Sequence, residues 1–334
     1  MNAVDHNNVV IFDDRGIPSI MCRFVRPKDT EEVPAVFKIG DKVADAIYIS
    51  KYPNIVIDGR AYSMPMADPT VNITFDGAVQ ACRCKGLDWH LMTAVEYEYL
   101  LNQSREKGTM PHGNTDWGKD YYHNDEQGKV SNLGRTYTGT GPVTWNHDHT
   151  PYGVSDLNGN VWEWLAGLRI KDGVIEFIPD NKAASPYCDL SKDSAEWQQA
   201  ETSKGPVRAN VECGEITITD AVAADDYEPD YDGVRIEKLE VELSEIPQVL
   251  KDLGIIPDKR AEEEGKTYVY FDATEGEYMP FRGSAFNNTS NSGPSALNLN
   301  NPRSNSNDNI GFRSALPLCQ EALRLRPQGQ YKQG

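Results

Sequence analysis

Residues 152–164 (YGVSDLNGNVWEW) place oxygen-bearing side chains next to two tryptophans. Carboxylate, amide and backbone carbonyl oxygens are the hard ligands that calcium prefers, while Trp162 and Trp164 supply large apolar area for a core. This pattern yields four candidate ligands of a structural calcium ion, namely Asp156, Gly159, Asn160 and Glu163. The alternative is that Asn160 and Glu163 only hydrogen-bond loop backbone.

A second segment, residues 281–316, carries amides and hydroxyls in unusual density. Between residues 287 and 309, nine of 23 residues are Asn and five are Ser. Such composition alone is typical of a disordered polar tract. Leu297 and Leu299, however, alternate with Asn298 and Asn300, which predicts a strand with leucines inward and asparagines outward. Strand character resumes at 310–316, so we expect an ordered polar surface whose core residues are Leu297, Leu299, Ile310 and Phe312.

Composition limits the possible partners. The 334 residues carry a formal charge of −18, which disfavours binding to nucleic acid or to anionic lipid. Neither a signal peptide nor a membrane-spanning stretch is visible, so we expect synthesis in a cytoplasm, without Sec export and without membrane insertion. The six cysteines are too few and too scattered for a disulfide framework, which predicts reduced, partly buried thiols.

The elements that must position these segments are short. Strands are predicted at 9–12, 20–25 and 46–52. One helix is predicted to begin near Thr74, a second behind the capping box Thr93–Glu96, and a third over 244–253, where Gly254 ends it. Residues 104–150 should form ordered loops or short strands. We interpret 170–275 as an acidic insertion whose charge runs, Asp225–Asp226 and Glu262–Glu264, are solvated.

Four blocks, in order, resemble the formylglycine-generating-enzyme (sulfatase-modifying-factor) family. They are 49–52 (ISKY); 91–99 (LMTAVEYEY), similar to the family's LPTEAEWE; 153–164, similar to GNVWEW; and 282–313, similar to RGGSW…GFR. The resemblance implies an α+β, C-type-lectin-like fold with short antiparallel sheets, two main helices and many ordered loops. We place this domain at 46–334, after a β-rich segment at 1–45 that we expect to serve for attachment. The resemblance also suggests calcium near the third block, and Arg282 and Arg313 are interpreted as structural hydrogen-bond donors.

The chain departs from the family where the chemistry resides. The family's oxidases bind copper through two cysteines soon after RGGSW, whereas here Asn288 and, approximately, Gly293 hold those positions. An amide does not replace the thiolate that Cu(I) requires. The related sulfoxide synthases add a His-rich helical domain that this chain lacks, and a metal role for the His147–His149 pair is disfavoured. We therefore expect a protein that is not an enzyme and has no cofactor beyond the structural calcium.

Residues 284–309, called the Asn/Ser tract below, resemble the variable region of diversity-generating-retroelement proteins. In those systems a reverse transcriptase mutates template adenines, so that Asn codons become NNY-type codons. Lys, Glu, Gln, Met and Trp, which NNY codons cannot encode, are absent between 283 and 309. Within a variable region at about 284–309, the resemblance implies these ligand-contacting positions: Ala285, Phe286, Asn288, Thr289, Ser290, Asn291, Ser292, Ser295, Asn298, Asn300, Ser304, Asn305, Ser306, Asn307, Asp308 and Asn309.

The sequence therefore predicts a non-enzymatic receptor-binding protein with a hypervariable surface, placed at a phage tail tip or reaching a cell surface by a non-Sec route. Its expected partners are a cell-surface protein or glycan, together with phage tail proteins that residues 1–45 would contact. Two alternatives stay open: a sulfatase-modifying enzyme with unrecognised chemistry, and a carbohydrate-binding lectin-like domain that is not diversified.

Overall fold

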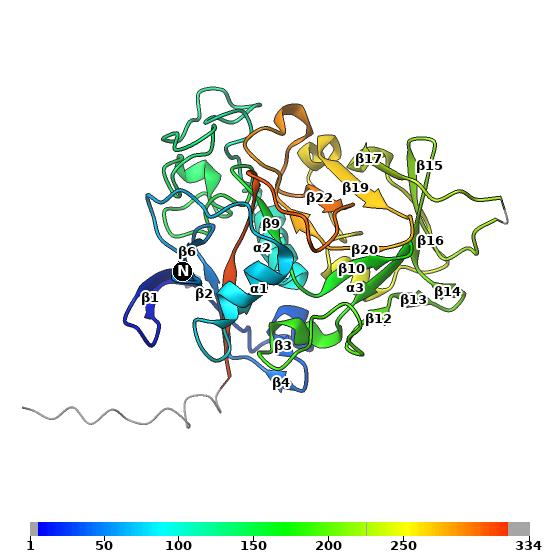
Figure 1. Cartoon of the computed structure of the whole chain (residues 1–334), viewed down its shortest axis with the longest axis horizontal. Coiled ribbons are helices and arrows are strands. Elements are labelled where there is room, and N and C mark those ends of the chain that lie inside the picture. The colour runs from blue at the N-terminus through cyan, green and yellow to red at the C-terminus, as the bar shows by residue number, and fades with distance from the viewer. Residues whose placement is uncertain (1–5, 225, 320–334) are drawn as a thin grey trace, which may run out of the picture.

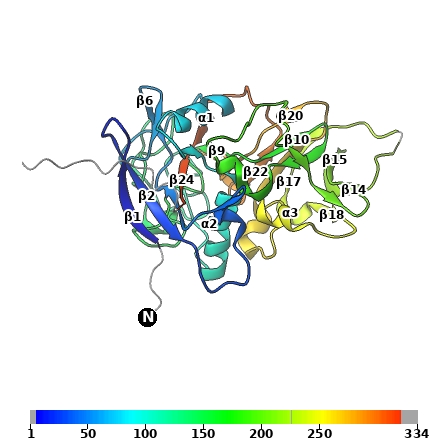
Figure 2. The same ribbon diagram turned by 90° about the horizontal axis from the view of Figure 1, so that it is seen from below.

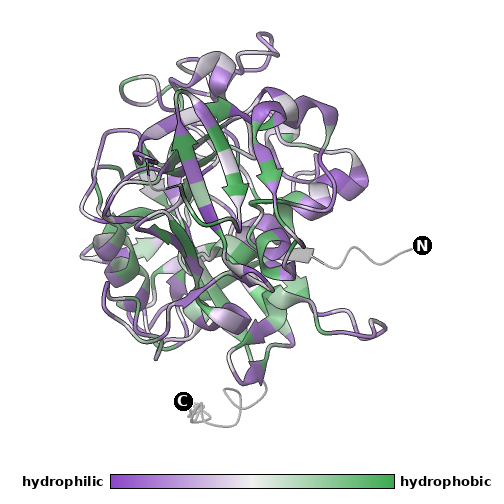
Figure 3. Cartoon of the chain, turned by 90° about the vertical axis from the view of Figure 1, so that its right-hand side faces the viewer, coloured by the Kyte–Doolittle hydropathy of each residue, from purple (hydrophilic) through white to green (hydrophobic). Residues whose placement is uncertain are grey.

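The fold is α+β, with short strands in three main sheets. The computed structural model describes residues 6–224 and 226–319. Strands β1 and β2 lie at one end of the molecule and β15 and β16 at the other (Figure 1). Strand ribbons carry many hydrophobic positions, whereas the connecting loops are mostly hydrophilic (Figure 3). No helix in the described part of the chain is long and apolar enough to cross a bilayer.

A five-stranded sheet joins the beginning of the chain to its C-terminal part (Figure 2). Its order is β1 (His6–Phe12), β2 (Pro18–Val25), β5 (Ala46–Ser50), β24 (Ser314–Leu318) and β8 (His90–Leu91). β2 pairs with β5 from Met21↔Ser50 to Val25↔Ala46. The predicted boundary at residue 45 therefore falls within one sheet, and an attachment role for residues 1–45 stays a prediction.

A six-stranded sheet holds the Asn/Ser tract. Its order is β17 (Tyr231–Arg235), β19 (Tyr268–Asp272), β22 (Leu297–Leu299), β21 (Phe281–Arg282), β9 (Trp162–Trp164) and β23 (Ile310–Phe312). β21 enters the tract and β23 leaves it, and both pair with β9. β22, in the middle of the tract, runs parallel to β19 and antiparallel to β21. One three-residue strand therefore fixes both ends of the tract.

A seven-stranded sheet contains most of the region interpreted as an insertion. Along its path lie β18 (Glu240–Glu242), β16 (Glu215–Thr219), β15 (Arg208–Glu212), β11 (Val174–Phe177), β10 (Leu168–Lys171) and β20 (Glu277–Tyr278), with β12 (Gln198–Gln199) on β11. Three hairpins complete the strands: β3/β4 (Lys38–Ile39, Lys42–Val43), β6/β7 (Ile55–Ile57, Arg60–Tyr62) and β13/β14 (Glu201–Thr202, Gly205–Pro206). Whether 170–275 is an insertion stays a prediction.

The two predicted main helices are confirmed, together with their caps. In α1 (Phe75–Arg83) the hydroxyl of Thr74 accepts a hydrogen bond from the Gly77 amide (3.1 Å). In α2 (Ala94–Lys107) Thr93 accepts from the Glu96 amide, and the Glu96 carboxylate accepts from the Thr93 amide. Each cap satisfies amides that the first turn of a helix leaves without partners.

The third predicted helix is shorter than expected. α3 spans Gln248–Asp252, because Ser244 does not cap it: the amide and hydroxyl of Ser244 both donate to the Asp220 carboxylate. The described residues also form six 3₁₀ turns: η1 (Ala35–Phe37), η2 (Val143–Trp145), η3 (Pro179–Ala184), η4 (Ile236–Lys238), η5 (Glu262–Lys266) and η6 (Thr289–Asn291).

Two apolar clusters support the tract. The larger one joins α2 (Tyr97, Leu100, Leu101) to the inward leucines of β22, Leu297 and Leu299. The second packs α1 against β9, β21 and β23 and contains Trp162, Trp164, Ile310 and Phe312. The four residues predicted to form the core under the tract are therefore buried, as expected.

Candidate ligand-binding surface

The tryptophan-rich segment forms a rigid floor below the tract. The Trp164 ring lies edge-on to Phe75 and Phe281, and its Nε1 donates to the Ile73 carbonyl (3.0 Å). Glu163, the residue between the tryptophans, accepts two hydrogen bonds from Arg313 (2.6 and 2.9 Å). Arg313 also donates to backbone carbonyls of residues 50, 51 and 155, and it is fully buried. The structural role predicted for Arg313 is thus confirmed.

Two of the four candidate calcium ligands, Asn160 and Glu163, have side chains engaged with other partners, and calcium binding stays a prediction. Both Glu163 oxygens bind Arg313, and the Asn160 side chain bonds the amide and the carbonyl of Thr136. The Gly159 turn packs directly against Asn114, whose carbonyl oxygen would lie 2.1 Å from an added Cβ. The described residues contain no group of three or more His, Cys, Asp or Glu side chains able to hold a metal. Hydrogen bonding to loop backbone, the alternative for Asn160, is what the structure shows.

Asp156, the remaining candidate, is a buried carboxyl whose Oδ2 accepts from the Gly139 amide (3.1 Å). Burial raises its pKa to about 6, because desolvation penalises the charged form more than the Gly139 hydrogen bond and Arg313 favour it. Asp156 thus belongs to the floor as a structural acceptor whose charge is sensitive to pH near neutrality.

The tract begins with a close approach to the floor. Gly283 has a φ of +90°, and an added Cβ would lie 2.5 Å from the Leu157 carbonyl oxygen. Only glycine satisfies both requirements without strain. The Tyr97 hydroxyl lies 2.7 Å from the Leu157 carbonyl and 2.8 Å from that of Pro294, and so ties α2 to the tract.

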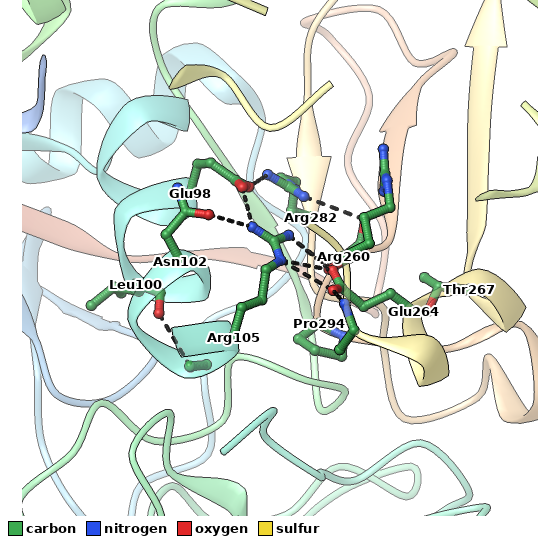
Figure 4. Close-up of polar contacts among 12 residues, drawn as sticks. Glu98, Leu100, Asn102, Arg105, Arg260, Glu264, Thr267, Arg282 and Pro294 are labelled. Atoms are coloured by element: carbon green, nitrogen blue, oxygen red, sulfur yellow. Dashed lines mark hydrogen bonds and ion pairs between the residues drawn. The ribbon is translucent and has the colours of Figure 1, made fainter. Parts of the chain in front are cut away.

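A buried charge network lies under the first half of the tract (Figure 4). Arg282 pairs with Glu98 of α2 (2.9 Å), and Arg105 of α2 pairs with both Glu98 and Glu264. Glu264 also accepts from the Ser295 hydroxyl. These side chains are at most 5% exposed, and bidentate arginine pairing offsets the cost of burying them. The structural role predicted for Arg282 is confirmed.

The same network corrects the interpretation of the acidic runs as solvated. Glu264 is 1% exposed, whereas Glu262 and Glu263 are exposed as predicted. Asp226 is exposed, and Asp225 lies outside the described residues. Glu264 is buried because its carboxylate balances Arg105, a residue 159 positions away, and no local pattern indicates such a pairing.

The tract is only partly a surface. Five of the sixteen candidate positions are buried, so the expectation that they point outward is wrong for Ala285, Phe286, Ser292, Ser295 and Asn298. The other eleven are half-buried or exposed: Asn288, Thr289, Ser290, Asn291, Asn300, Ser304, Asn305, Ser306, Asn307, Asp308 and Asn309.

Each buried polar member of the tract has an internal partner. Ser295 bonds Glu264, Ser292 donates to the Thr289 carbonyl, and the Asn298 amide oxygen accepts from residues 300 and 301. Phe286 packs edge-on against Trp117 (6.2 Å between ring centroids). These five side chains pack within the protein, so the accessible side-chain surface of the candidate positions belongs to the other eleven.

The first exposed stretch, residues 287–291, is hydrogen-bonded to the loop at 115–122. The Trp117 amide donates to the Phe286 carbonyl (2.8 Å), the Thr289 amide to the Thr115 carbonyl (2.9 Å), and the Tyr122 hydroxyl to the Ser290 carbonyl (3.0 Å). Trp117, Tyr121 and Tyr122 are themselves 38–54% exposed. Sequence reasoning missed these aromatic residues, although their presence in an otherwise polar loop was a usable signal.

The second exposed stretch, residues 300–309, is held mainly by two arginines. Arg303 pairs with Glu277 and Asp76, and Arg135 donates to the Asp308 carbonyl (2.8 Å) while pairing with Asp68. The Asn309 amide donates to the Asn287 side-chain oxygen (3.3 Å), so the two exposed stretches meet.

A pocket of about 180 Å³ opens beside the first stretch. The stacked rings of His112 and His123 (3.6 Å between centroids, 6° between planes) line it together with Tyr122. The Nδ1 of His112 lies 3.0 Å from Glu126, and that of His123 lies 3.1 Å from Asp120. The remaining lining residues are Met110, Pro111, Asp120, Asn158, Glu263, Glu264, Thr267, Ser292, Gly293 and Pro294.

Comparison with known proteins places the chain in a family. Residues 54–317, most of its length, match the model of the sulfatase-modifying factor enzyme 1-like domain. The chain belongs to this family. A curated relative, the formylglycine-generating enzyme of Mus musculus, is 36% identical over 105 residues, which cover 29% of this chain. The chain spans about a quarter (27%) of that enzyme's length.

Two solved structures align with most of this sulfatase-modifying-factor-like chain, at low TM-scores. The Major Tropism Determinant I1 variant has a TM-score of 0.34 at 12% identity, and the alignment covers 94% of this chain and 55% of the variant's chain. The U1 variant has a TM-score of 0.31 at 12% identity, and the alignment covers 96% of this chain and 74% of the variant's chain.

This member of the sulfatase-modifying-factor family does not fit copper where the tract runs. Asn288 is engaged with the Ala285 amide (2.8 Å), and Gly293 has no side chain. Burial raises the pKa of Cys22 to about 12 and that of Cys188 to about 11, and also raises that of Cys82, so these thiols stay protonated at neutral pH. His147 accepts from the Val154 amide and His149 bonds the Met110 carbonyl, both within loop backbone.

Proposed function

We propose that this chain is a non-catalytic ligand-binding member of its family, and that residues 287–291 and 300–309 form its recognition surface. The observation that carries the proposal is the contrast in the tract between a hydrogen-bonded backbone and eleven half-buried or exposed side chains rich in amides and hydroxyls.

A fixed backbone favours recognition. Ordering a loop on binding costs about 1–2 kcal/mol per residue, so a tract that is already ordered retains that free energy for contacts. Amide and hydroxyl side chains give adaptable hydrogen bonds, and neighbouring Trp and Tyr side chains supply contact area at low entropic cost. Residues 115–122 and 287–291 together have this composition.

The residue palette of the tract supports diversification by a retroelement, and a receptor on a host cell would be the ligand of a phage tail protein of this kind. The coding DNA tests the proposal directly. We expect a nearby near-repeat of codons 284–309 that differs only at adenines, next to a reverse-transcriptase gene. Absence of both would leave an undiversified binding protein.

A displayed library tests the surface itself. Randomising the eleven surface positions with NNY codons should leave most clones folded, with melting temperatures within a few degrees of the parent, because surface substitutions usually change stability by about 0.5 kcal/mol or less. The matched library at the five buried positions should give mostly unfolded clones. Binders to an immobilised test protein should emerge from the first library, and equal tolerance in both would refute the proposed surface.

Family membership and the match to the mouse enzyme favour a second candidate, an oxidase of the sulfatase-modifying class. Copper titration, together with incubation with a Cys-containing sulfatase peptide, tests it. Stoichiometric Cu(I) binding or conversion of the peptide cysteine would support the enzyme, and we expect neither.

A further inference from the structure

The pocket beside the first exposed stretch is lined by groups suited to a cation. Its lining contains three carboxylates, Asp120, Glu263 and Glu264, and neither Lys nor Arg. Glu264 is paired with Arg105, and Asp120 accepts from three backbone amides. Glu263 is exposed and makes no ion pair with any described residue. Arg105 balances Glu264, so Glu263 is the carboxylate of the lining that is left to attract a cation.

The aromatic walls of the pocket point to the same class of ligand. Each stacked histidine directs Nδ1 at a carboxylate, which accepts the hydrogen bond from its N–H. The Tyr122 ring contributes an aromatic face to the lining, and the Lys266 ammonium lies 5.9 Å from its centroid, so an incoming cation would have to displace that side chain. Ring faces and nearby carboxylates together favour ammonium and guanidinium groups.

The size of the pocket limits the ligand to a small group. Its 180 Å³ lies below the roughly 300–1,000 Å³ of pockets for drug-sized molecules. A single long side chain inserted from a partner fits this scale. Ten of the thirteen lining residues lie outside the tract, so such an anchor would be the same in every variant of the surface.

We propose that this pocket binds a basic side chain, a lysine ammonium or an arginine guanidinium, presented by a protein ligand. The inference rests on the proposed binding function and specifies its partner: a protein whose contact surface is basic. The formal charge of −18 on the whole chain is complementary to such a partner and speeds its approach.

The test uses isolated side-chain probes and the full-length protein. Nα-acetyl-lysine-N-methylamide and its arginine analogue are titrated while the imidazole signals of His112 and His123 are followed by NMR. The norleucine and glutamate analogues serve as neutral and anionic controls. We expect the basic probes alone to shift both histidines, with millimolar affinity that weakens as salt is added.

Two adjacent glutamates provide matched variants. Glu263→Gln should weaken binding of the basic probes about fivefold, which corresponds to about 1 kcal/mol for one exposed charge pair. Glu262→Gln, an equally exposed neighbour outside the pocket lining, should leave binding unchanged. Equal binding of the norleucine probe, identical behaviour of the two variants, or no histidine shift would each overturn the inference. The tract libraries test the proposed binding surface without involving Glu263. Failure of the pocket inference, seen with the probes, is therefore distinguishable from failure of the proposed binding function, seen with the libraries.

Discussion

Residues 292–299 and 300–309 share an amide- and hydroxyl-rich composition but differ in environment. Every residue of the first stretch is buried, whereas none of the second is. The first stretch passes through β22, between β19 and β21, and lies above the Glu98–Arg105–Glu264 network. The second stretch is held by Arg303, which pairs with Asp76 at the start of α1 and with Glu277 in β20. Neighbouring elements, and not composition, thus decide which polar residues face a ligand.

The largest expected effect comes from the charge network under the buried stretch. Glu98→Gln leaves Arg105 and Arg282 facing a neutral amide in a dry site, so unfolding by denaturant should show a loss of about 3–5 kcal/mol. Glu106→Gln, at an exposed position of the same helix, should change the free energy of unfolding by about 0.5 kcal/mol or less. Similar values for the two variants would mean that the network is hydrated.

A smaller effect is expected in the floor below both stretches. The pKa of Asp156 is about 6 in the folded state, above its ordinary 3.8. Below pH 3.8 the carboxyl is protonated in both states and the folded state has its full stability. As the pH rises through 6, the unfolded state ionises more readily, so the free energy of unfolding falls. Asp156→Asn should therefore stabilise the protein above pH 6, by on the order of 2–3 kcal/mol, and have little effect near pH 4. Unfolding curves across pH 4–8 measure this, and a gain independent of pH would contradict it.

A pair of asparagines separates the two stretches at their junction. Asn298→Ala removes a buried acceptor of two hydrogen bonds and should destabilise the protein by about 1–2 kcal/mol. Asn300→Ala, two residues on and partly exposed, should cost less than about 1 kcal/mol. Thermal unfolding followed by circular dichroism measures both losses of stability. A larger loss for Asn300→Ala than for Asn298→Ala would contradict the assignment of residue 298 to the buried stretch and residue 300 to the exposed one.

The smallest effect is expected where the exposed aromatic loop meets the first stretch. Tyr122→Phe loses one partly exposed hydrogen bond to the Ser290 carbonyl and should cost about 0.5–1 kcal/mol. Tyr187→Phe, at an 80% exposed tyrosine elsewhere, serves as control and should be neutral. Hydrogen exchange of the 287–291 amides should quicken only in the first variant.

Local signals predicted local structure well. Thr74 and the Thr93–Glu96 box fixed the starts of both main helices, because a cap acts within one turn. Alternation placed Leu297 and Leu299 in the core correctly, and the family motifs indicated the α+β fold.

The errors concern partners distant in sequence. Asn298 is buried against expectation because residues 300 and 301 fold back and donate hydrogen bonds to its side-chain oxygen. Glu264 is buried by Arg105, and Ser244 is drawn from its helix to Asp220. The Asn160 side chain holds residue 136 of a neighbouring loop, a pairing that its motif does not indicate. Periodicity and spacing do not encode such long-range pairings.

The attachment of both β21 and β23 to the three residues of β9 has an evolutionary consequence. The entrance and exit of the tract share one anchor, so replacing its exposed side chains leaves the strands on either side in place. Under the proposed diversification, new surfaces would arise from the exposed positions alone, while β9 and the buried positions of the tract keep the residues that the fold requires.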